Sequence, residues 1–210
     1  MMFADRIAAG SRLAEAVAFL AGPDVVVVGL PRGGVPVAVE IARSLGAPMD
    51  VIVVGKLGVP GRPELAMGAL GEGGVRVVNE DVVRAAGVSQ EEFDRVERIG
   101  RAEVERRAAR FRGGRTPLSL DGRTVIVVDD GIATGASARA ACQIVREHGA
   151  ARVVLAVPVG PSAVIRDLRD VADEVICVHA PTRFGAVGQF YADFEQTTDE
   201  EVRASLRRTR

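Results

Sequence analysis

The chain has 210 residues, 48% of them hydrophobic, and a formal net charge of −1. This length predicts one domain over residues 1–210, and the near-neutral charge argues against nucleic acid or an anionic membrane as a partner. No uncharged apolar stretch reaches the ~20 residues of a membrane span. The N-terminus lacks the features of a signal peptide, and two distant cysteines without a CxxC motif argue against a zinc or disulfide framework. We therefore expect a cytoplasmic protein that binds neither nucleic acid nor membrane.

Apolar runs of strand length alternate with helical patterns along the chain. The predicted elements, in chain order, are a helix over 5–20, a strand over 25–30, a helix over 35–45, a strand over 50–54, a loop over 55–63, two short strands over 66–70 and 75–79 that form a hairpin, a helix over 89–111, a strand over 124–128, a helix over 137–147, a strand over 152–157, a helix over 161–169 and a strand over 174–178. Continuously apolar strands suit a sheet covered on both faces, and the alternation favours βαβ crossovers. The predicted fold class is α/β, with a mainly parallel central sheet flanked by helices and an insertion of a hairpin and a long helix at about 66–114.

The predicted helix over 89–111 carries only a narrow apolar stripe. Acidic residues precede basic residues by four positions, as in Glu91–Arg95 and Glu103–Arg107. This order stabilises an exposed helix by roughly 0.2–0.5 kcal/mol per pair. We expect the helix to lie across the body or in the interface of a homodimer, with a simple solvated face as the alternative.

The most informative segment is 125–137, where four apolar residues lead to Asp129 and Asp130 and then to small residues that end at Ser137. In open α/β sheets, ligands bind at the carboxyl ends of strands. The small residues, with Gly135 allowing close approach, lead into a helix whose free N–H groups can bind a phosphate. Carboxylates repel phosphate, so we expect them to bind hydroxyls or a metal. A ribose 5-phosphate has a phosphate at one end and a diol at the other, and it satisfies both halves.

This segment resembles the signature of type I phosphoribosyltransferases, which bind phosphoribosyl pyrophosphate (PRPP). The resemblance implies that Asp129 and Asp130 hold the ribose hydroxyls and, directly or through water, the Mg²⁺ that accompanies PRPP. It also implies that five loop residues bind the 5′-phosphate: Ala133, Thr134, Gly135, Ala136 and Ser137. Two positions depart from the family pattern, since Gly131 replaces an aliphatic residue and Ala133 replaces an acid that purine-salvage members often carry. The nitrogenous acceptor is thereby left unidentified.

A second loop, Pro31-Arg32-Gly33-Gly34, follows another apolar strand. Its glycines let backbone N–H groups face an anion, and an arginine can bind phosphate oxygens in a bidentate manner. The loop looks like the family's pyrophosphate loop. The resemblance implies that Arg32, Gly33 and Gly34 bind the leaving pyrophosphate and that the Pro31–Arg32 peptide bond is cis.

Two further stretches supply candidate contacts. In the family a mobile loop near Lys56 closes over the reacting sugar and excludes water, which makes Lys56 and Arg62 candidates for pyrophosphate binding. An ordinary glycine- and proline-rich surface loop is the alternative. After the last predicted strand, Phe184, Phe190 and Tyr191 are placed either to stack on the acceptor base or to plug the end of the sheet.

The resemblance covers nearly the whole chain and implies Mg²⁺-dependent transfer of ribose 5-phosphate from PRPP to a nucleobase or other nitrogen nucleophile, with release of pyrophosphate. The implied catalytic residues are Asp129, Asp130, Arg32 and Lys56. The alternative is a regulatory protein that binds PRPP or a nucleotide without catalysis, motivated by Ala133 and the helix over 89–111. A phosphatase or kinase that uses the two aspartates is disfavoured, because the chain has no GxxxxGK[ST] motif.

Overall fold

The computed structural model describes residues 1–208 and contains a five-stranded parallel sheet in the order β2-β1-β6-β7-β8. Its strands are β1 (Val25–Gly29), β2 (Met49–Val51), β6 (Thr124–Val128), β7 (Arg152–Val159) and β8 (Glu174–His179). The central pair β1 and β6 is in register from Val25 opposite Thr124 to Gly29 opposite Val128. The α/β class predicted from the sequence is confirmed, although β2 is shorter than the predicted strand over 50–54.

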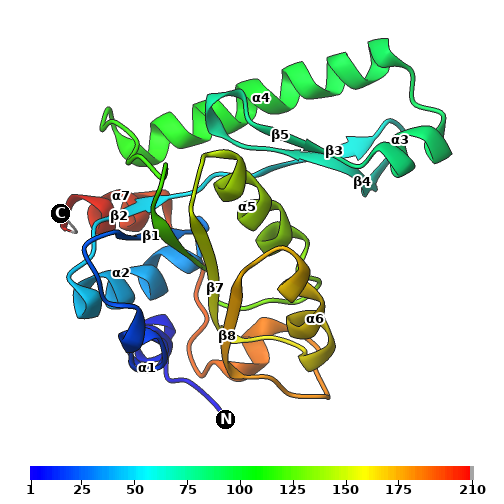
Figure 1. Ribbon diagram of the computed structural model, residues 1–210. Coiled ribbons are helices and arrows are strands. Elements are labelled where there is room, and N and C mark those ends of the chain that lie inside the picture. The colour runs from blue at the N-terminus through cyan, green and yellow to red at the C-terminus, as the bar shows by residue number, and fades with distance from the viewer. Residues whose placement is uncertain (209–210) are drawn as a thin grey trace.

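Helices cover both faces of this sheet (Figure 1). One side carries α1 (Arg6–Val17) and α2 (Gly34–Leu45), and the other carries α5 (Ala136–Glu147) and α6 (Ser162–Asp167). Successive valines of β1 point to opposite sides, because strand side chains alternate: Val25 and Val27 join the core under α1 and α2, and Val26 and Val28 join the core under α5. This two-sided burial explains why the strands are apolar at every position.

The chain also forms an arm, residues 55–112, that projects from the main sheet (Figure 1). The arm consists of an antiparallel sheet in the order β3-β4-β5 with two helices, and its elements are β3 (Gly55–Val59), β4 (Arg62–Leu70), β5 (Arg76–Val78), α3 (Glu80–Ala86) and α4 (Gln90–Arg112). The predicted pairing of the strands near 66–70 and 75–79 is confirmed by β4 and β5. The remaining elements are α7 (Asp199–Arg208) and the 3₁₀ turns Ala18–Leu20, Glu72–Gly74, Leu168–Asp170 and Val187–Phe190.

The prediction of a loop over 55–63 is wrong, because this stretch forms β3 and the start of β4. Leu57 and Val59 are buried, and the pairing of β3 with β4 shifts register on both sides of Gly58. A Cβ at Gly58 would lie 2.7 Å from the Cα of Pro63. The glycine therefore permits a close approach within a bulged hairpin, whereas the sequence pattern indicated a loop.

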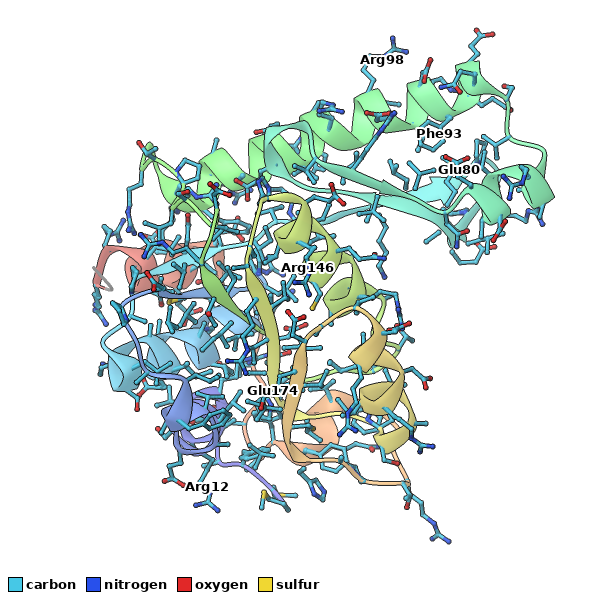
Figure 2. The ribbon with its side chains drawn as sticks, viewed as in Figure 1. Arg12, Glu80, Phe93, Arg98, Arg146 and Glu174 are labelled. Atoms are coloured by element: carbon cyan, nitrogen blue, oxygen red, sulfur yellow. The ribbon has the colours of Figure 1, made fainter. Side chains whose placement is uncertain are left out.

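The long helix predicted over 89–111 is confirmed by α4. Ser89 begins it with a capping box, in which its side chain accepts from the backbone N–H of Glu92 and the Glu92 carboxylate accepts from the Ser89 N–H. The apolar stripe of α4 packs within the chain. Figure 2 shows Phe93 pointing from α4 toward the small sheet. Val104 and Phe111 are buried in the same apolar cluster as residues of α1 and α2. The homodimer stays a prediction, as does the division into one domain with an insertion at about 66–114. Within residues 1–208 no helix combines the length and the apolar character needed to cross a membrane.

A buried ion cluster joins the arm to the main sheet. Arg112, at the end of α4 and only 9% exposed, donates from Nε to both carboxylate oxygens of Asp50 on β2, at 2.9 and 3.0 Å. Its Nη1 donates to Glu72, which follows β4, and its Nη2 donates to the Val51 carbonyl at 3.0 Å. Backbone N–H groups of Leu118 and Val53 donate to the same two carboxylates. One guanidinium therefore ties three separate parts of the chain together.

Replacing Arg112 with Met is expected to destabilise the protein by about 3–5 kcal/mol, because two buried carboxylates lose their counter-ion. Urea unfolding measures this difference. Arg84→Met is the control, since Arg84 lies on α3 with an exposed ion pair and the change should cost no more than about 0.5 kcal/mol. Similar effects for the two variants would contradict the role given to Arg112.

Candidate active site

Pairing of β1 with β6 brings two predicted loops together at one edge of the sheet. The Leu30 N–H donates to the Val128 carbonyl at 2.8 Å, so residues 31–34 begin beside the residues that follow β6. Residues 31–34 are called the pyrophosphate loop below, after the ligand expected from the sequence. A Cβ at Gly33 would lie 2.0 Å from Oδ2 of Asp130, and one at Gly34 would lie 2.6 Å from the Val128 carbonyl oxygen. Only glycine fits at either position without a shift of its neighbours, and this explains the pair of glycines in the sequence.

The pyrophosphate loop contains the predicted cis peptide bond between Pro31 and Arg32. The Arg32 side chain is 38% exposed, and its Nη1 lies 3.5 Å from Oδ1 of Asp199, the first residue of α7. Arg32 is thus at the surface of the site with an internal carboxylate as its partner.

Asp129 and Asp130, the acid pair, lie largely out of solvent. Oδ2 of Asp130 accepts a hydrogen bond from Nε of Arg6 at 2.8 Å, and Oδ1 of Asp129 accepts from the Asp130 N–H at 2.9 Å. Burial raises the pKa of Asp129 well above its usual value, and the charge of Asp130 raises it further. Burial also raises the pKa of Asp130, although the hydrogen bond from Arg6 offsets part of that effect. Hydroxyl groups of a ligand, or a cation, would therefore stabilise the charged form of the acid pair.

Arg6 contacts the acid pair, although no sequence motif indicates it. It is the first residue of α1, where the Asp5 side chain caps the helix by accepting from the Ala8 N–H at 2.7 Å. Its Nη1 donates to the Glu195 carbonyl at 2.6 Å, and its guanidinium lies 4.0 Å from the centre of the Phe194 ring. The partner Asp130 is 124 residues away, so no local pattern marks the pair.

The phosphate loop, residues 133–137, lies at the start of α5. Gly135 has φ 77°, and a Cβ there would lie 2.8 Å from Val164 on α6. Ala133, Thr134, Ala136 and Ser137 are exposed. The first N–H groups of a helix have no partner within the helix, so this end of α5 offers backbone donors and the hydroxyls of Thr134 and Ser137. The Ala136 N–H donates weakly to Oγ1 of Thr134, at 3.5 Å.

Lys56 and Arg62 both belong to the arm. Lys56, on β3, lines a cavity of about 450 Å³ between the small sheet and α5, and Ala136 of the phosphate loop lines the same cavity. Arg62 is exposed where β4 begins. Arg32 lines a different cavity, so the structure brings Lys56 toward the phosphate loop and Arg32 toward α4 and α7. The expected mobile loop at Lys56 is a paired strand in the structure.

The C-terminal aromatic residues lie next to the acid pair. The Tyr191 hydroxyl donates to the Asp130 carbonyl at 2.5 Å, and its ring, 5% exposed, packs on Phe3 and Phe194. Those contacts favour a positioning role for Tyr191. Phe184 and Phe190 stack with ring centres 5.2 Å apart, and their role in acceptor binding stays a prediction.

The unusual Gly131 has a structural explanation. A Cβ at this position would lie 2.4 Å from Val187, which belongs to the C-terminal segment that carries the aromatic residues. The space of the aliphatic residue expected from the family pattern is filled by Val187 instead. The segment beyond the last strand is therefore part of the site wall.

An acid pair, a loop of small residues and a glycine-rich arginine loop therefore meet at one edge of a parallel sheet. The sequence matches the phosphoribosyl transferase domain family over residues 4–195. The chain therefore belongs to the phosphoribosyl transferase family.

Known relatives agree with this membership. The chain is 57% identical over 207 residues to "Putative phosphoribosyl transferase Rv0571c" of Mycobacterium tuberculosis strain H37Rv and, equally, to "Putative phosphoribosyl transferase MT0597" of strain CDC 1551. The match covers 99% of this chain but 47% of those proteins, so the chain spans about half the length of these curated relatives. The crystal structure of TT1426 from Thermus thermophilus superposes with a TM-score of 0.91 at 45% identity, covering 100% of this chain and 99% of that one.

Gly33→Ala tests the contact between the pyrophosphate loop and the acid pair. Gly33 has an ordinary helical φ of −60°, so alanine is conformationally acceptable and its methyl group acts only by displacing the Asp130 carboxylate. We expect overpacking to cost about 1–3 kcal/mol in urea unfolding. The control is Gly22→Ala, whose Cβ would meet no atom closer than 3.9 Å. An unchanged stability in Gly33→Ala would show that the loops lie further apart.

Asp129→Asn tests the raised pKa. The folded protein holds the Asp129 proton more tightly than the unfolded chain, so the free energy of unfolding falls as pH rises from about 4 through the raised pKa. The variant has no ionisable group at position 129, so its free energy of unfolding does not fall for this reason. It should match or exceed the wild type in stability at neutral pH. Urea midpoints from about pH 4 to 8 measure the difference, with the exposed Asp24→Asn as control. Parallel curves for wild type and Asp129→Asn would refute the shift.

Proposed function

We propose that the protein transfers the ribose 5-phosphate group of PRPP to a nitrogen nucleophile and releases pyrophosphate. The observation that carries the proposal is the close approach of the pyrophosphate loop to the acid pair, with Gly33 against Asp130. One ligand that spans both loops must have hydroxyls beside a charged phosphate group. PRPP has this arrangement around C1 of its ribose, and family membership supports the same substrate.

Each part of PRPP has a complementary part of the chain. The amides and hydroxyls of the phosphate loop bind the 5′-phosphate, and the acid pair accepts hydrogen bonds from the ribose hydroxyls. Arg32 and the amides of Gly33 and Gly34 hold the pyrophosphate. Lys56 and Arg62, which extend from the arm, are proposed as further pyrophosphate contacts.

The donors present suit a Mg²⁺ ion that arrives with PRPP. Among the described residues, no group of three or more His, Cys, Asp and Glu side chains is placed to hold a metal alone. Mg²⁺ is usually held by one or two carboxylates together with substrate phosphates, and the acid pair supplies the carboxylates. When bound, the ion neutralises charge on the pyrophosphate.

The chain's own residues then favour displacement at C1. The bond from C1 to the pyrophosphate oxygen breaks, the bond from C1 to the acceptor nitrogen forms, and positive charge develops on the ribose. Asp129 and Asp130 lie beside that charge, in surroundings with little water, where electrostatic stabilisation is strong. Arg32 and Lys56 stabilise the negative charge on the leaving group.

The acceptor side is proposed to be the wall formed by the C-terminal segment. Val187 covers Gly131, and the stacked pair Phe184 and Phe190 lies on the same segment. An apolar wall with aromatic rings suits a flat nitrogenous base. Ala133 provides no acid to protonate that base, so acceptors that react without such help fit best.

Asp129→Asn/Asp130→Asn is expected to reduce pyrophosphate release from PRPP and Mg²⁺ by at least about a hundredfold in a screen of nucleobases and small amines, because the transition-state charge loses its partners. Asp24→Asn is the control, because Asp24 precedes β1, at the opposite edge of the sheet, and its ion pair with Arg123 is exposed. Absence of a Mg²⁺-dependent thermal shift with PRPP in the wild type would overturn the proposal. Saturable PRPP binding without turnover on any acceptor would favour the regulatory alternative.

A further inference from the structure

A second basic cavity lies beside the pyrophosphate loop. This arginine pocket has a volume of about 460 Å³ and is formed where α4, α7 and the loop meet. Its charged lining residues are Arg32, Arg106, Arg107, Arg110, Glu103 and Asp199. Four guanidinium groups therefore face two carboxylates in a concave space.

The arginines of α4 reach this pocket because of their spacing. Arg107 and Arg110 are three positions apart, and Arg106 and Arg110 are four apart, so their side chains share one side of the helix. Arg106 pairs with Glu103, and Arg110 pairs with Asp199. Arg107 has no carboxylate partner within residues 1–208. The pocket thus has positive charge that the chain itself does not neutralise.

Asp199 pairs with arginines from two sides of the pocket. Its carboxylate lies 2.6 Å from Nη2 of Arg110 and 3.5 Å from Nη1 of Arg32, so it bridges α4 and the pyrophosphate loop. The start of α7 does not need this carboxylate, because Thr198 and Glu201 form their own reciprocal cap there. An internal carboxylate that bridges two arginines occupies the position that a phosphate oxygen would take.

We propose that the arginine pocket is a binding site for a polyphosphate anion, which replaces Asp199 between Arg32 and Arg110 and recruits Arg107. Arginine suits this role because its planar group binds phosphate oxygens in pairs. The volume is in the range of small-molecule sites, roughly 300–1,000 Å³. The anion is either free pyrophosphate or the phosphate chain of a nucleotide. Its assignment to pyrophosphate released by the reaction rests on the proposed function, whereas the binding site itself does not.

Titration calorimetry with pyrophosphate and, separately, with ATP tests the site by comparing the wild type with Arg107→Ala/Arg110→Ala, because the proposed PRPP site uses neither of these arginines. Arg107→Ala/Arg110→Ala is expected to weaken binding at least tenfold. Arg98→Ala is the matched control, because Arg98 lies on the same helix and points away from the body (Figure 2). Binding by pyrophosphate alone identifies the reaction's product, and binding by ATP alone identifies a nucleotide. Equal affinity in the double-alanine variant and the control, or no binding of either anion, would overturn the proposal.

Asp199→Asn supplies the opposite change. It keeps the size of the side chain and the Thr198–Glu201 cap but removes the competing charge, so we expect pyrophosphate to bind about three- to tenfold more tightly. Weaker binding would show that Asp199 supports the site rather than occupying it. Failure of PRPP to bind the wild type sinks the proposed function and leaves this titration unaffected, so the two ideas fail separately.

Discussion

The site depends on one backbone pairing, that of β1 with β6. Because the two strands are parallel and in register to their last residues, the loops that follow them leave the sheet side by side. Gly33 and Gly34 then let the first loop lie directly against Asp130 and the end of β6, because neither glycine has a side chain to hold them apart. Amides and an arginine on one loop attract anions, whereas the two carboxylates on the other repel anions and accept hydrogen bonds from hydroxyls. A single ligand that contacts both loops must therefore carry an anionic group and hydroxyls. The pairing therefore restricts the ligand before any individual contact is considered.

The arm depends on a different interaction. Arg112 joins α4, β2 and the turn after β4 through buried hydrogen bonds, and it fixes the end of α4 against the main sheet. Lys56 on β3 and the arginines of α4 lie on opposite parts of the arm, and they line separate cavities. A buried ion cluster with several backbone donors has few alternative arrangements of similar energy, because any other leaves a charge unpaired. The arm is thus held to the sheet by geometry that apolar packing alone does not specify.

Sequence patterns predicted the parts of the site that are contiguous in the chain. Asp129, Asp130 and the phosphate loop follow one strand, and their residue types indicate their chemistry. Arg6 and Tyr191 reach Asp130 across 124 and 61 residues, and no periodicity or motif encodes such a contact. The loop prediction over 55–63 failed for another reason, since its glycines and prolines serve a bulged hairpin. The short, polar helices α3 and α7 lack an apolar pattern long enough to be recognised.

The missed residues share a physical role, which is to neutralise the charges that the predicted motifs concentrate. Arg6 pairs with Asp130, and Asp199 pairs with Arg32 and Arg110. The candidate site concentrates carboxylates on one loop and cations near another, and like charges repel one another. Internal partners from α1 and α7 reduce that repulsion, and the side chains of Arg6 and Asp199 are only 12% and 16% exposed. The residues hardest to predict from sequence are therefore those that balance the charges of the candidate site, whereas the recognisable motifs are those that concentrate the charges.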